Sequence, residues 1–325
     1  MKFIQSVLIL SLSIILLQSV NAQRLLPSQQ KKVNHELLMA VGSGNYRAAE
    51  QALNAGANPN VEGDFGYFPL IYTAEDNNVD LALLLIRYGA IPNKKTHTGY
   101  TPLIAASEQG SMKMVALLLK HGADVQTKTR QGLDAFMIAV RSGFEDVLSL
   151  LIGYGASINT ADKHGDTALM MSIKKQHFHI MRMLLMAGAD SNIESKNSGT
   201  ALMLAAQQQD PRYVYELLNR RADVTAKDDT GSTALHIASS YASYDVVDLL
   251  LKHPQIQINA IDKDGWTPLM VAAFQGKTRV VKLLIANHAD PRIINKNGQN
   301  ALMLAEHNKH DQIIVVLKQY LLANS

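Results

Sequence analysis

Apolar residues recur along this chain at a fixed interval of 33 residues. One apolar position can be followed from the first quarter of the chain to its C-terminal end in steps of 33, with a single step of 34. Its members are Leu37, Leu70, Leu103, Phe136, Leu169, Leu202, Leu235, Leu269 and Leu302. A period of this size indicates a protein built from about nine stacked structural units.

The residues within one period predict two helices followed by a turn. Thr101 suits a helix N-cap, because its hydroxyl can accept a hydrogen bond from a free backbone N–H. Pro102 suits the first helical position, where no N–H is needed. The apolar stripe of residues 114–119 is typical of a second helix, and Gly122 favours a left-handed helix end. The polar stretch that follows predicts a turn projecting from the stack.

Several units share a short motif with a known family. Gly99–Leu103 and Gly265–Leu269 read Gly-x-Thr-Pro-Leu, and Gly231–His236 keeps a histidine after the leucine. These segments resemble the ankyrin repeat, and the resemblance covers about residues 34–320. It implies an all-α fold, an ankyrin-repeat solenoid of about nine helix-turn-helix units with projecting β-turn hairpins, whose first and last units act as caps.

The chain departs from the family pattern at several places, among them Asp134–Phe136, which replaces Thr-Pro-Leu in unit four. Most units carry Ile or Met at the histidine position, so the bond that the family's histidine makes to the neighbouring loop is expected to be absent there. The segment 220–223 has Arg where Gly is expected, so its helix is expected to end differently. The segment 253–258 contains the single insertion.

The N-terminus has the three parts of a secretory signal. A short start with Lys2 precedes an uncharged apolar run, and small residues precede a cut after Ala22. The predicted organisation is a signal peptide at 1–22, a polar leader at 23–33 and the repeat domain at 34–325. The alternative is an uncleaved membrane anchor, although the apolar run is shorter than a bilayer requires. The expected location is the periplasm or the extracellular space, with no stable membrane insertion after cleavage.

Composition narrows the classes of partner. Lys and Arg number 31 against 28 Asp and Glu, a net charge of +3 that becomes +2 without Lys2. This balance is too small for nucleic-acid binding by phosphate neutralisation. The chain has no Cys, which excludes disulfides, thiolate nucleophiles and iron–sulfur clusters. No Asn-x-Ser/Thr sequon occurs, which favours a bacterial periplasm over a eukaryotic secretory route.

Candidate catalytic or metal-binding groups have simpler explanations. His177 and His179 point to different sides of a helix, and His307 and His310 lack a third ligand at metal spacing. The methionines within residues 170–186 occupy positions that the repeat buries. No His-Glu-x-x-His, Gly-x-Ser-x-Gly or phosphate-binding glycine loop is present. The sequence therefore predicts a non-enzyme without cofactor or metal.

The resemblance also implies a partner-binding surface, made by the turn tips and the outward positions of each first helix. Carried over residue by residue, the candidates are Phe65, Tyr67, Glu75, Asp76, Tyr100, Glu108, Arg141, Lys174, Lys175, Tyr241, Trp266 and Phe274. Tyr67, Tyr100 and Trp266 share one position, and such aromatics often anchor interfaces. The alternative is that they only cover the hairpin base.

Charge alternates along this surface. It is acidic in units two and three, basic in units four and five, and acidic again at Asp228, Asp229, Asp262 and Asp264. Such banding could fix the register of one partner, or it could be ordinary solvated surface.

The sequence thus predicts an exported, monomeric protein that binds another protein through its concave face, in a bacterial periplasm. Three alternatives are a secreted effector acting on host proteins, an immunity or accessory protein for one envelope toxin or enzyme, and an enzyme or metal buffer on this scaffold. The fold itself does not decide among them, because it binds unrelated proteins.

Overall fold

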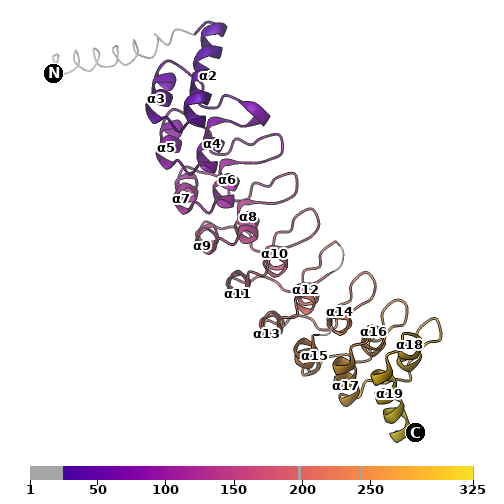
Figure 1. Cartoon of the computed structure of the whole chain (residues 1–325). Coiled ribbons are helices and arrows are strands. Elements are labelled where there is room, and N and C mark those ends of the chain that lie inside the picture. The colour runs from indigo at the N-terminus through magenta and orange to yellow at the C-terminus, as the bar shows by residue number, and fades with distance from the viewer. Residues whose placement is uncertain (1–24, 197–198, 242, 325) are drawn as a thin grey trace, which may run out of the picture.

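The computed structural model describes residues 25–196, 199–241 and 243–324. Within these residues the chain forms eighteen α-helices, paired in order into nine units (Figure 1). The first helices of the units are α2 (Pro27–Gly42), α4 (Pro69–Glu75), α6 (Pro102–Glu108), α8 (Ala135–Ser142), α10 (Ala168–Lys174), α12 (Ala201–Gln207), α14 (Ala234–Tyr241), α16 (Pro268–Phe274) and α18 (Ala301–His307). The second helices are α3 (Tyr46–Asn54), α5 (Val79–Arg87), α7 (Met112–Lys120), α9 (Glu145–Gly153), α11 (Phe178–Met186), α13 (Pro211–Asn219), α15 (Tyr244–Leu251), α17 (Thr278–Ala286) and α19 (Asp311–Ala323). The predicted all-α repeat stack is confirmed.

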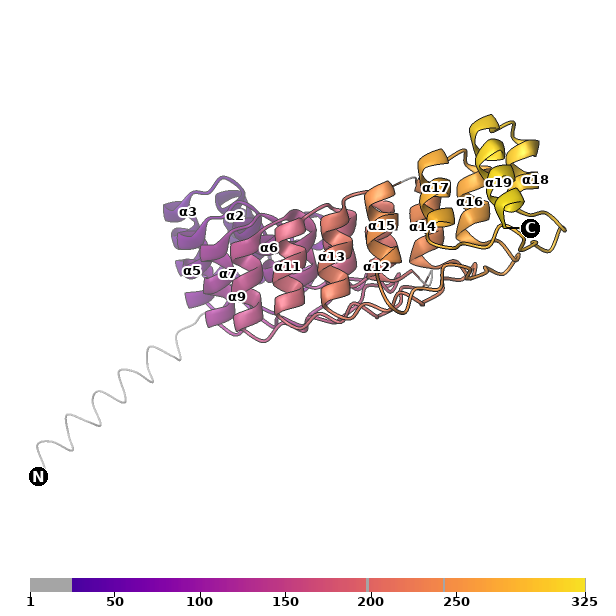
Figure 2. The same ribbon diagram turned by 90° about the horizontal axis from the view of Figure 1, so that it is seen from below.

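The units stack into an elongated array with three parallel rows (Figures 1 and 2). First helices contact first helices, as α6 does with α4 and α8, and second helices contact second helices. The loops between units form the third row and project on the side away from the second helices (Figure 1). We call the face made by the loops and first helices the inner surface, and the face made by the second helices the outer surface.

The apolar position that repeats every 33 residues forms the centre of the stack. In the first eight units its side chain is at most 1% exposed. Leu302, in unit nine, stays partly exposed because no further unit covers it. These residues join one continuous core that extends through all nine units. Each unit buries its apolar face only against its neighbours, so contacts between adjacent units carry the stability of the array.

Side-chain caps fix the start of the first helices. The Oγ1 of Thr101 accepts a hydrogen bond from the N–H three residues further on, at 3.2 Å, and three other units repeat this contact with threonine. In unit four Asp134 replaces the threonine, and its carboxylate accepts the equivalent bond from Met137 at 2.8 Å. The departure in sequence therefore preserves the cap.

The second helix of unit six ends as the others do, so the expectation of a different ending was wrong. Arg221 adopts a left-handed φ of 61°, where Gly89 and Gly122 have 92° and 82°. Its N–H donates to the C=O of Leu218 at 3.1 Å, and its own C=O accepts a bond from Asn192 at 3.2 Å. These contacts hold a non-glycine residue in a conformation that is normally disfavoured.

The hairpin loops also bond to each other. Within the described residues, five neighbouring pairs of loops are joined by one backbone hydrogen bond each, such as that from the N–H of Lys196 to the C=O of His164 at 2.8 Å. This approach is so close that a Cβ on Gly165, whose φ is +79°, would lie 2.5 Å from the Lys196 nitrogen. Glycine is therefore required at this position for both its conformation and its size.

An asparagine that recurs at this period ties neighbouring units together. The Nδ2 of Asn93 donates to the C=O of Gly122 at 2.7 Å, and its Oδ1 accepts from the N–H of Asp124 at 2.7 Å. Asn60 and Asn192 make the same two bonds to the units that follow them. These side chains pair backbone groups at helix ends that lack an intrahelical partner.

Replacing Asn93 by alanine is expected to lower the free energy of unfolding by about 1 kcal/mol, because two hydrogen bonds between units are lost at an exposed site. Urea denaturation followed by far-UV circular dichroism measures the change. Asn297→Ala is the matched control, since that exposed side chain makes no hydrogen bond within the described residues. Equal losses in the two variants would contradict a linking role for Asn93.

The first unit begins earlier than expected. Helix α2 starts at Pro27, so residues 27–33, predicted as part of a polar leader, belong to the first helix. The Nε2 of Gln30 donates to the C=O of Gly56 at 2.9 Å, which ties this segment to the end of α3. The predicted signal peptide at 1–22 lies outside the described residues. Within the described part, no helix is long and apolar enough to cross a membrane.

Candidate protein-binding surface

Residues eight positions apart meet on the inner surface. The first of each pair lies at the end of the hairpin, just before the helix cap, and the second at the C-terminal end of the first helix. In unit three the Tyr100 hydroxyl donates to the Glu108 carboxylate at 2.7 Å. In unit five the Lys174 ammonium lies 2.6 Å from the Asp166 carboxylate. The repeat therefore places predicted site residues side by side in successive units.

Units two and three carry a cluster of Tyr67, Tyr72, Tyr100, Glu75 and Glu108, which we call the acidic–aromatic cluster. The rings of Tyr67 and Tyr100 are stacked, with centroids 6.2 Å apart and planes at 18°. The ring of Tyr72 lies 5.6 Å from that of Tyr67, tilted by 56°. Burial, and then the bond to Glu108, hold the pKa of Tyr100 well above its usual range.

The two carboxylates of the cluster differ in their partners. Glu108 pairs with Arg141 of unit four, whose guanidinium nitrogen lies 3.0 Å from Oε1. Glu75 lies beside the Tyr67 hydroxyl and has no Lys or Arg partner within the described residues. Burial, together with the charges of Asp76 and Glu108, raises the pKa of Glu75. This carboxylate is therefore partly desolvated without a compensating cation.

The middle and the far end of the surface differ from this cluster. Lys174 is paired with Asp166, whereas Lys175 is exposed and unpaired within the described chain. Next along the stack, the Tyr241 hydroxyl accepts a hydrogen bond from the Gln207 amide at 2.8 Å. In unit eight the Trp266 and Phe274 rings meet edge to face, with centroids 5.4 Å apart. The surface thus runs from an acidic and aromatic cluster, through exposed lysines, to an aromatic pair in unit eight.

The aromatic side chains both cover the hairpin base and remain accessible to a partner. Tyr67, Tyr100 and Trp266 pack partly against the core, as covers of the hairpin base would, and each remains partly accessible. Phe274 is 40% exposed, and Phe65 is 95% exposed in the short 3-10 turn η1 (Asp64–Gly66). Of these, Phe65 is the side chain most fully presented to solvent.

Two of the four acidic residues in units seven and eight, Asp228 and Asp262, have a local structural role. The Oδ1 of Asp262 accepts hydrogen bonds from the N–H groups of Asp264 and Trp266, at 2.9 and 2.8 Å. The Oδ1 of Asp228 accepts equivalent bonds from Thr230 and Ser232. Asp228 and Asp262 therefore shape their own hairpins, which gives two of the four acidic residues in this band a structural role.

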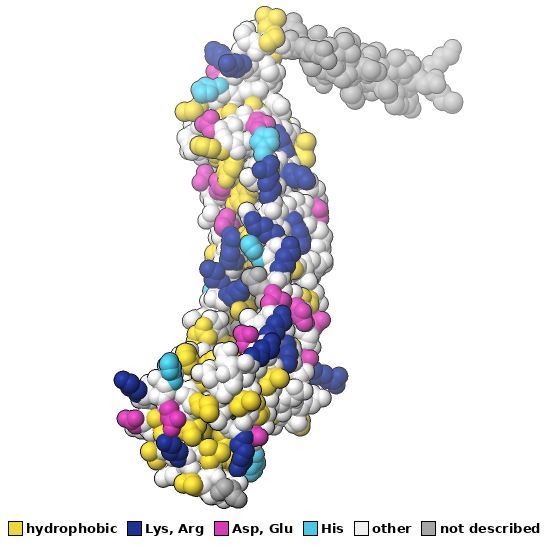
Figure 3. Space-filling model, turned by 90° about the vertical axis from the view of Figure 1, so that its right-hand side faces the viewer, with side chains coloured by type: hydrophobic (Ala, Val, Ile, Leu, Met, Phe, Trp, Pro, Cys, Tyr) yellow, Lys and Arg dark blue, Asp and Glu magenta, His cyan; other side chains and the backbone are white. Residues whose placement is uncertain are grey.

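The loop side of the molecule is rich in Lys and Arg (Figure 3). Exposed basic side chains recur at one position of successive loops, 33 residues apart, as in Arg130, Lys163 and Lys196. The spacing of this basic row is visible in the sequence, although the family pattern does not place Lys163 or Lys196 among the candidates. Tyr72 was missed for another reason, since only the fold shows that its ring joins Tyr67.

His236 makes the bond expected of the histidine in this motif. Its Nδ1 accepts from the N–H of Thr233 at 3.1 Å, and its Nε2 lies 3.0 Å from the C=O of Trp266, to which it donates. The ring is 3% exposed, and this burial lowers its pKa below the usual 6.5. A neutral histidine thus links unit seven to the hairpin that carries Trp266.

The lowered pKa of His236 predicts a pH dependence of stability. As the pH falls below 6.5 the unfolded chain takes up a proton that the folded chain still excludes, so stability decreases until the pH passes the folded pKa. His236→Met, which copies Met203 and Met270, is expected to lose less stability between pH 7.5 and 5.5 than the wild type. Urea midpoints at the two pH values measure this, and equal losses would contradict the prediction.

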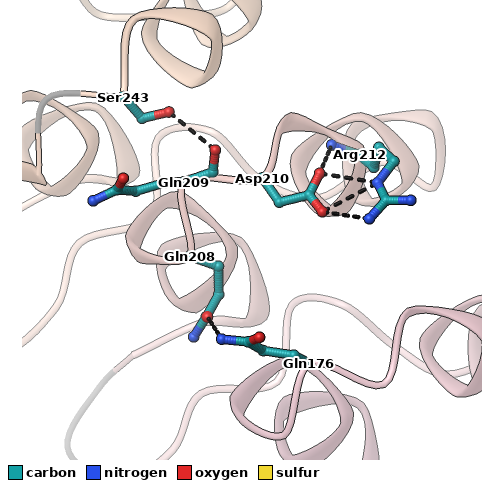
Figure 4. Close-up of polar contacts among 6 residues, drawn as sticks. All are labelled: Gln176, Gln208, Gln209, Asp210, Arg212 and Ser243. Atoms are coloured by element: carbon teal, nitrogen blue, oxygen red, sulfur yellow. Dashed lines mark hydrogen bonds and ion pairs between the residues drawn. The ribbon is translucent and has the colours of Figure 1, made fainter.

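Other histidines and polar residues link the turns within units to neighbouring turns. The Nε2 of His177 lies 3.3 Å from the Arg141 C=O, and that of His310 lies 3.0 Å from the Phe274 C=O. Ser243 fills the same position in unit seven and donates to the Gln209 C=O at 3.4 Å (Figure 4). Figure 4 also shows the amides of Gln176 and Gln208, which pair at 3.2 Å, and the Asp210 carboxylate paired with the Arg212 guanidinium.

Among the described residues, no three His, Asp or Glu side chains gather as a metal site would require.

Comparison with known proteins gives matches confined to repeats. "Ankyrin repeat family A protein 2" of Mus musculus is 48% identical over 48 residues, which cover 15% of this chain and 15% of that protein. "Serine/threonine-protein kinase TNNI3K" of Mus musculus is 34% identical over 85 residues, covering 23% and 10%. "Protein phosphatase 1 regulatory subunit 12A" of Mus musculus is 38% identical over 65 residues, covering 20% and 6%. The chain thus spans under a sixth of each relative's length, and the match to the kinase covers repeats only.

A family profile covers nearly all of the described chain. The profile described as "Ankyrin repeats (3 copies)" matches residues 37–129, 125–195, 185–262 and 255–324. These matches run from the first helix pair to the last and agree with the nine units of the structure. The chain belongs to the ankyrin-repeat family.

Proposed function

We propose that this chain is a protein-binding module that holds one partner against its inner surface, without chemical turnover. The observation that carries the proposal is the row of accessible aromatic and charged side chains that the repeat brings together, from Phe65 and Tyr100 through Lys175 to Phe274. Ankyrin repeats typically bind proteins, and stacked repeats offer extended surfaces suited to this purpose. Aromatic residues in a rigid setting lose little entropy on binding, which suits them as anchors.

A tagged pull-down from cells that express the chain naturally tests this function. The wild type is run beside Tyr100→Ala and beside Tyr154→Ala, which removes an exposed tyrosine from the end of the outer helix α9. One stoichiometric partner that is lost with Tyr100→Ala and retained with Tyr154→Ala is expected. A partner retained by every inner-surface variant would place binding elsewhere and contradict the proposal.

We further propose that the chain is exported and acts in a bacterial periplasm as a monomer. The support is the charged start, apolar run and small residues that end at Ala22. Cell fractionation with N-terminal sequencing tests this, and a periplasmic protein that begins at Gln23 is expected. Recovery from the medium would favour the effector, whereas an envelope toxin or enzyme as the captured partner would favour the immunity or accessory protein. A cytoplasmic protein that retains Met1 would overturn export.

A further inference from the structure

We propose that the acidic–aromatic cluster of units two and three binds a Lys or Arg side chain of the partner. This inference rests on the proposed function and adds the chemistry of one contact to it. It follows from three features of the inner surface: an uncompensated negative charge, an electron-rich pair of rings and an apolar side chain held out beside them.

The charge around the cluster is unbalanced. The carboxylates of Asp64, Glu75, Asp76 and Glu108 act on its tyrosines and on Glu75, and Arg141 is the cation paired there, which leaves a net charge of −3 from four acids and one base. Arg141 already engages Glu108, and no Lys or Arg among the described residues pairs with Glu75. A cation placed beside Glu75 would relieve the repulsion between these carboxylates.

Lys94, in the hairpin that follows unit two, already has partners of its own. The Lys94 ammonium donates to the C=O of Asn60 and lies 5.0 Å from the centroid of the Phe68 ring. In that position Lys94 links its own loop to the loop that contains Asn60. Since no Lys or Arg of the described residues pairs with Glu75, a complementary cation would be supplied by the partner.

Unit five shows how a carboxylate on the inner surface can be paired with a cation of the same chain. At the positions that correspond to Tyr67 and Glu75, unit five has Asp166 and Lys174, and these two pair at 2.6 Å. A carboxylate at this place on the inner surface is thus satisfied by an ammonium when one is present. In unit two Tyr67 replaces the aspartate and Glu75 replaces the lysine, so Glu75 has a neutral hydroxyl beside it and its negative charge is left for a partner.

The rings suit a cation as well as the carboxylates do. Tyr67 and Tyr100 are stacked within 6.2 Å, and Tyr72 closes one side of the pair. A Lys or Arg head group within about 6 Å of such a face is attracted by the ring electrons. The same geometry would accept the flat guanidinium of Arg against a ring while its N–H groups reach Glu75.

Phe65 supplies the apolar part of the contact. It is 95% exposed and has a φ of 58°, a conformation that is uncommon for a bulky residue. The turn η1 holds it two residues before Tyr67. A long basic side chain has an apolar stem, and Phe65 is placed to cover that stem while the head group meets the cluster.

Peptide selection on the full chain tests the inference without a known partner. Random twelve-residue peptides displayed on phage are selected on the wild type, and the peptides retained are measured against Glu75→Gln. This variant removes the charge and keeps the shape, and it breaks no ion pair seen in the described structure. Glu145→Gln is the matched control, because it removes the same charge from the exposed start of the outer helix α9.

Peptides with a recurrent Lys or Arg are expected, and Glu75→Gln should weaken them at least about tenfold while Glu145→Gln leaves them unchanged. Replacing the selected Arg by citrulline, or Lys by norleucine, should weaken binding to the wild type similarly. Peptides that are lost with Trp266→Ala yet lack a basic residue and ignore Glu75→Gln would overturn the cation contact and leave the binding function intact. Peptides that bind every inner-surface variant equally would overturn both.

Discussion

Replacing Leu202 by aspartate is expected to lower the free energy of unfolding by roughly 5 kcal/mol, which is enough to unfold the centre of the array. Leu202 is 1% exposed and belongs to the column of apolar residues that joins successive units. Removing a buried leucine side chain alone costs about 2 to 5 kcal/mol, and an unpaired carboxylate in the core adds to that cost. Unit six also lies in the middle of the stack, where both of its neighbours lose contacts.

The consequence of Leu202→Asp should differ between the two halves of the molecule. Because each unit contacts only its neighbours, units one to five and seven to nine can retain structure when unit six is lost. Far-UV circular dichroism in urea reports all helices, and the fluorescence of Trp266, the only tryptophan, reports unit eight. The two signals are expected to coincide in the wild type and to separate in the variant.

Met186→Asp is the control for the introduced charge. Met186 lies at the end of α11 and is 70% exposed, so the expectation that the repeat buries it was wrong. Its replacement should change stability by less than about 0.5 kcal/mol. A loss as large as that of Leu202→Asp would mean that added charge, not the buried position, destabilises the array. Coincident signals in Leu202→Asp would show that the nine units unfold as one.

The repeat could be predicted from the sequence because its causes are local. Thr101 caps its helix, Gly122 ends one in the left-handed conformation, and the column of leucines is buried as expected. Arg221 shows where local reasoning failed. Glycine adopts this conformation freely, and in Arg221 it is held by a contact with the preceding unit, the bond from Asn192. The intrinsic propensity of a residue does not include such contacts.

The positions of the candidate surface residues could be predicted from the repeat, but their side-chain partners could not. The family's positions led to Tyr100 and Glu108, and they lie together. Glu108 pairs with Arg141 of the next unit, whereas Glu75 has no such partner in the described chain. This difference depends on how far side chains reach between units, which the sequence does not show. The same holds for Asp262, which looks like a surface charge in the sequence and in the fold orders the hairpin of Trp266.

The structure also changes what is expected of Trp266. From the sequence alone its replacement should affect binding with little effect on stability. The ring is instead partly buried, packs against the core and meets Phe274 at 5.4 Å, while the backbone of the residue is fixed by Asp262 and His236. A tryptophan held from several sides is preorganised, which favours tight binding by its exposed edge.

Trp266→Ala is therefore expected to weaken binding of the partner recovered by pull-down at least about 30-fold, the loss typical of an interface anchor of about 2 kcal/mol. The same change should lower the free energy of unfolding by about 1 to 2 kcal/mol, since part of the ring's packing against Phe274 and the core is lost. The array should stay folded, because the Asp262 and His236 bonds involve the backbone of residue 266 and survive the substitution. Calorimetric titration gives the dissociation constant, and thermal melting by circular dichroism gives the stability.

Two further variants separate anchoring from packing. Trp266→Phe keeps an aromatic ring beside Phe274, so it should recover most of the stability and only part of the affinity. Phe274→Ala keeps the tryptophan and removes its edge-to-face neighbour, so it should weaken binding less than Trp266→Ala does. If Trp266→Ala abolishes the folded signal, the ring is a core residue and the inner surface has no anchor in unit eight. If it leaves the affinity unchanged while Tyr100→Ala removes it, the partner is held at the acidic–aromatic end, and the aromatic pair of unit eight only covers its hairpin.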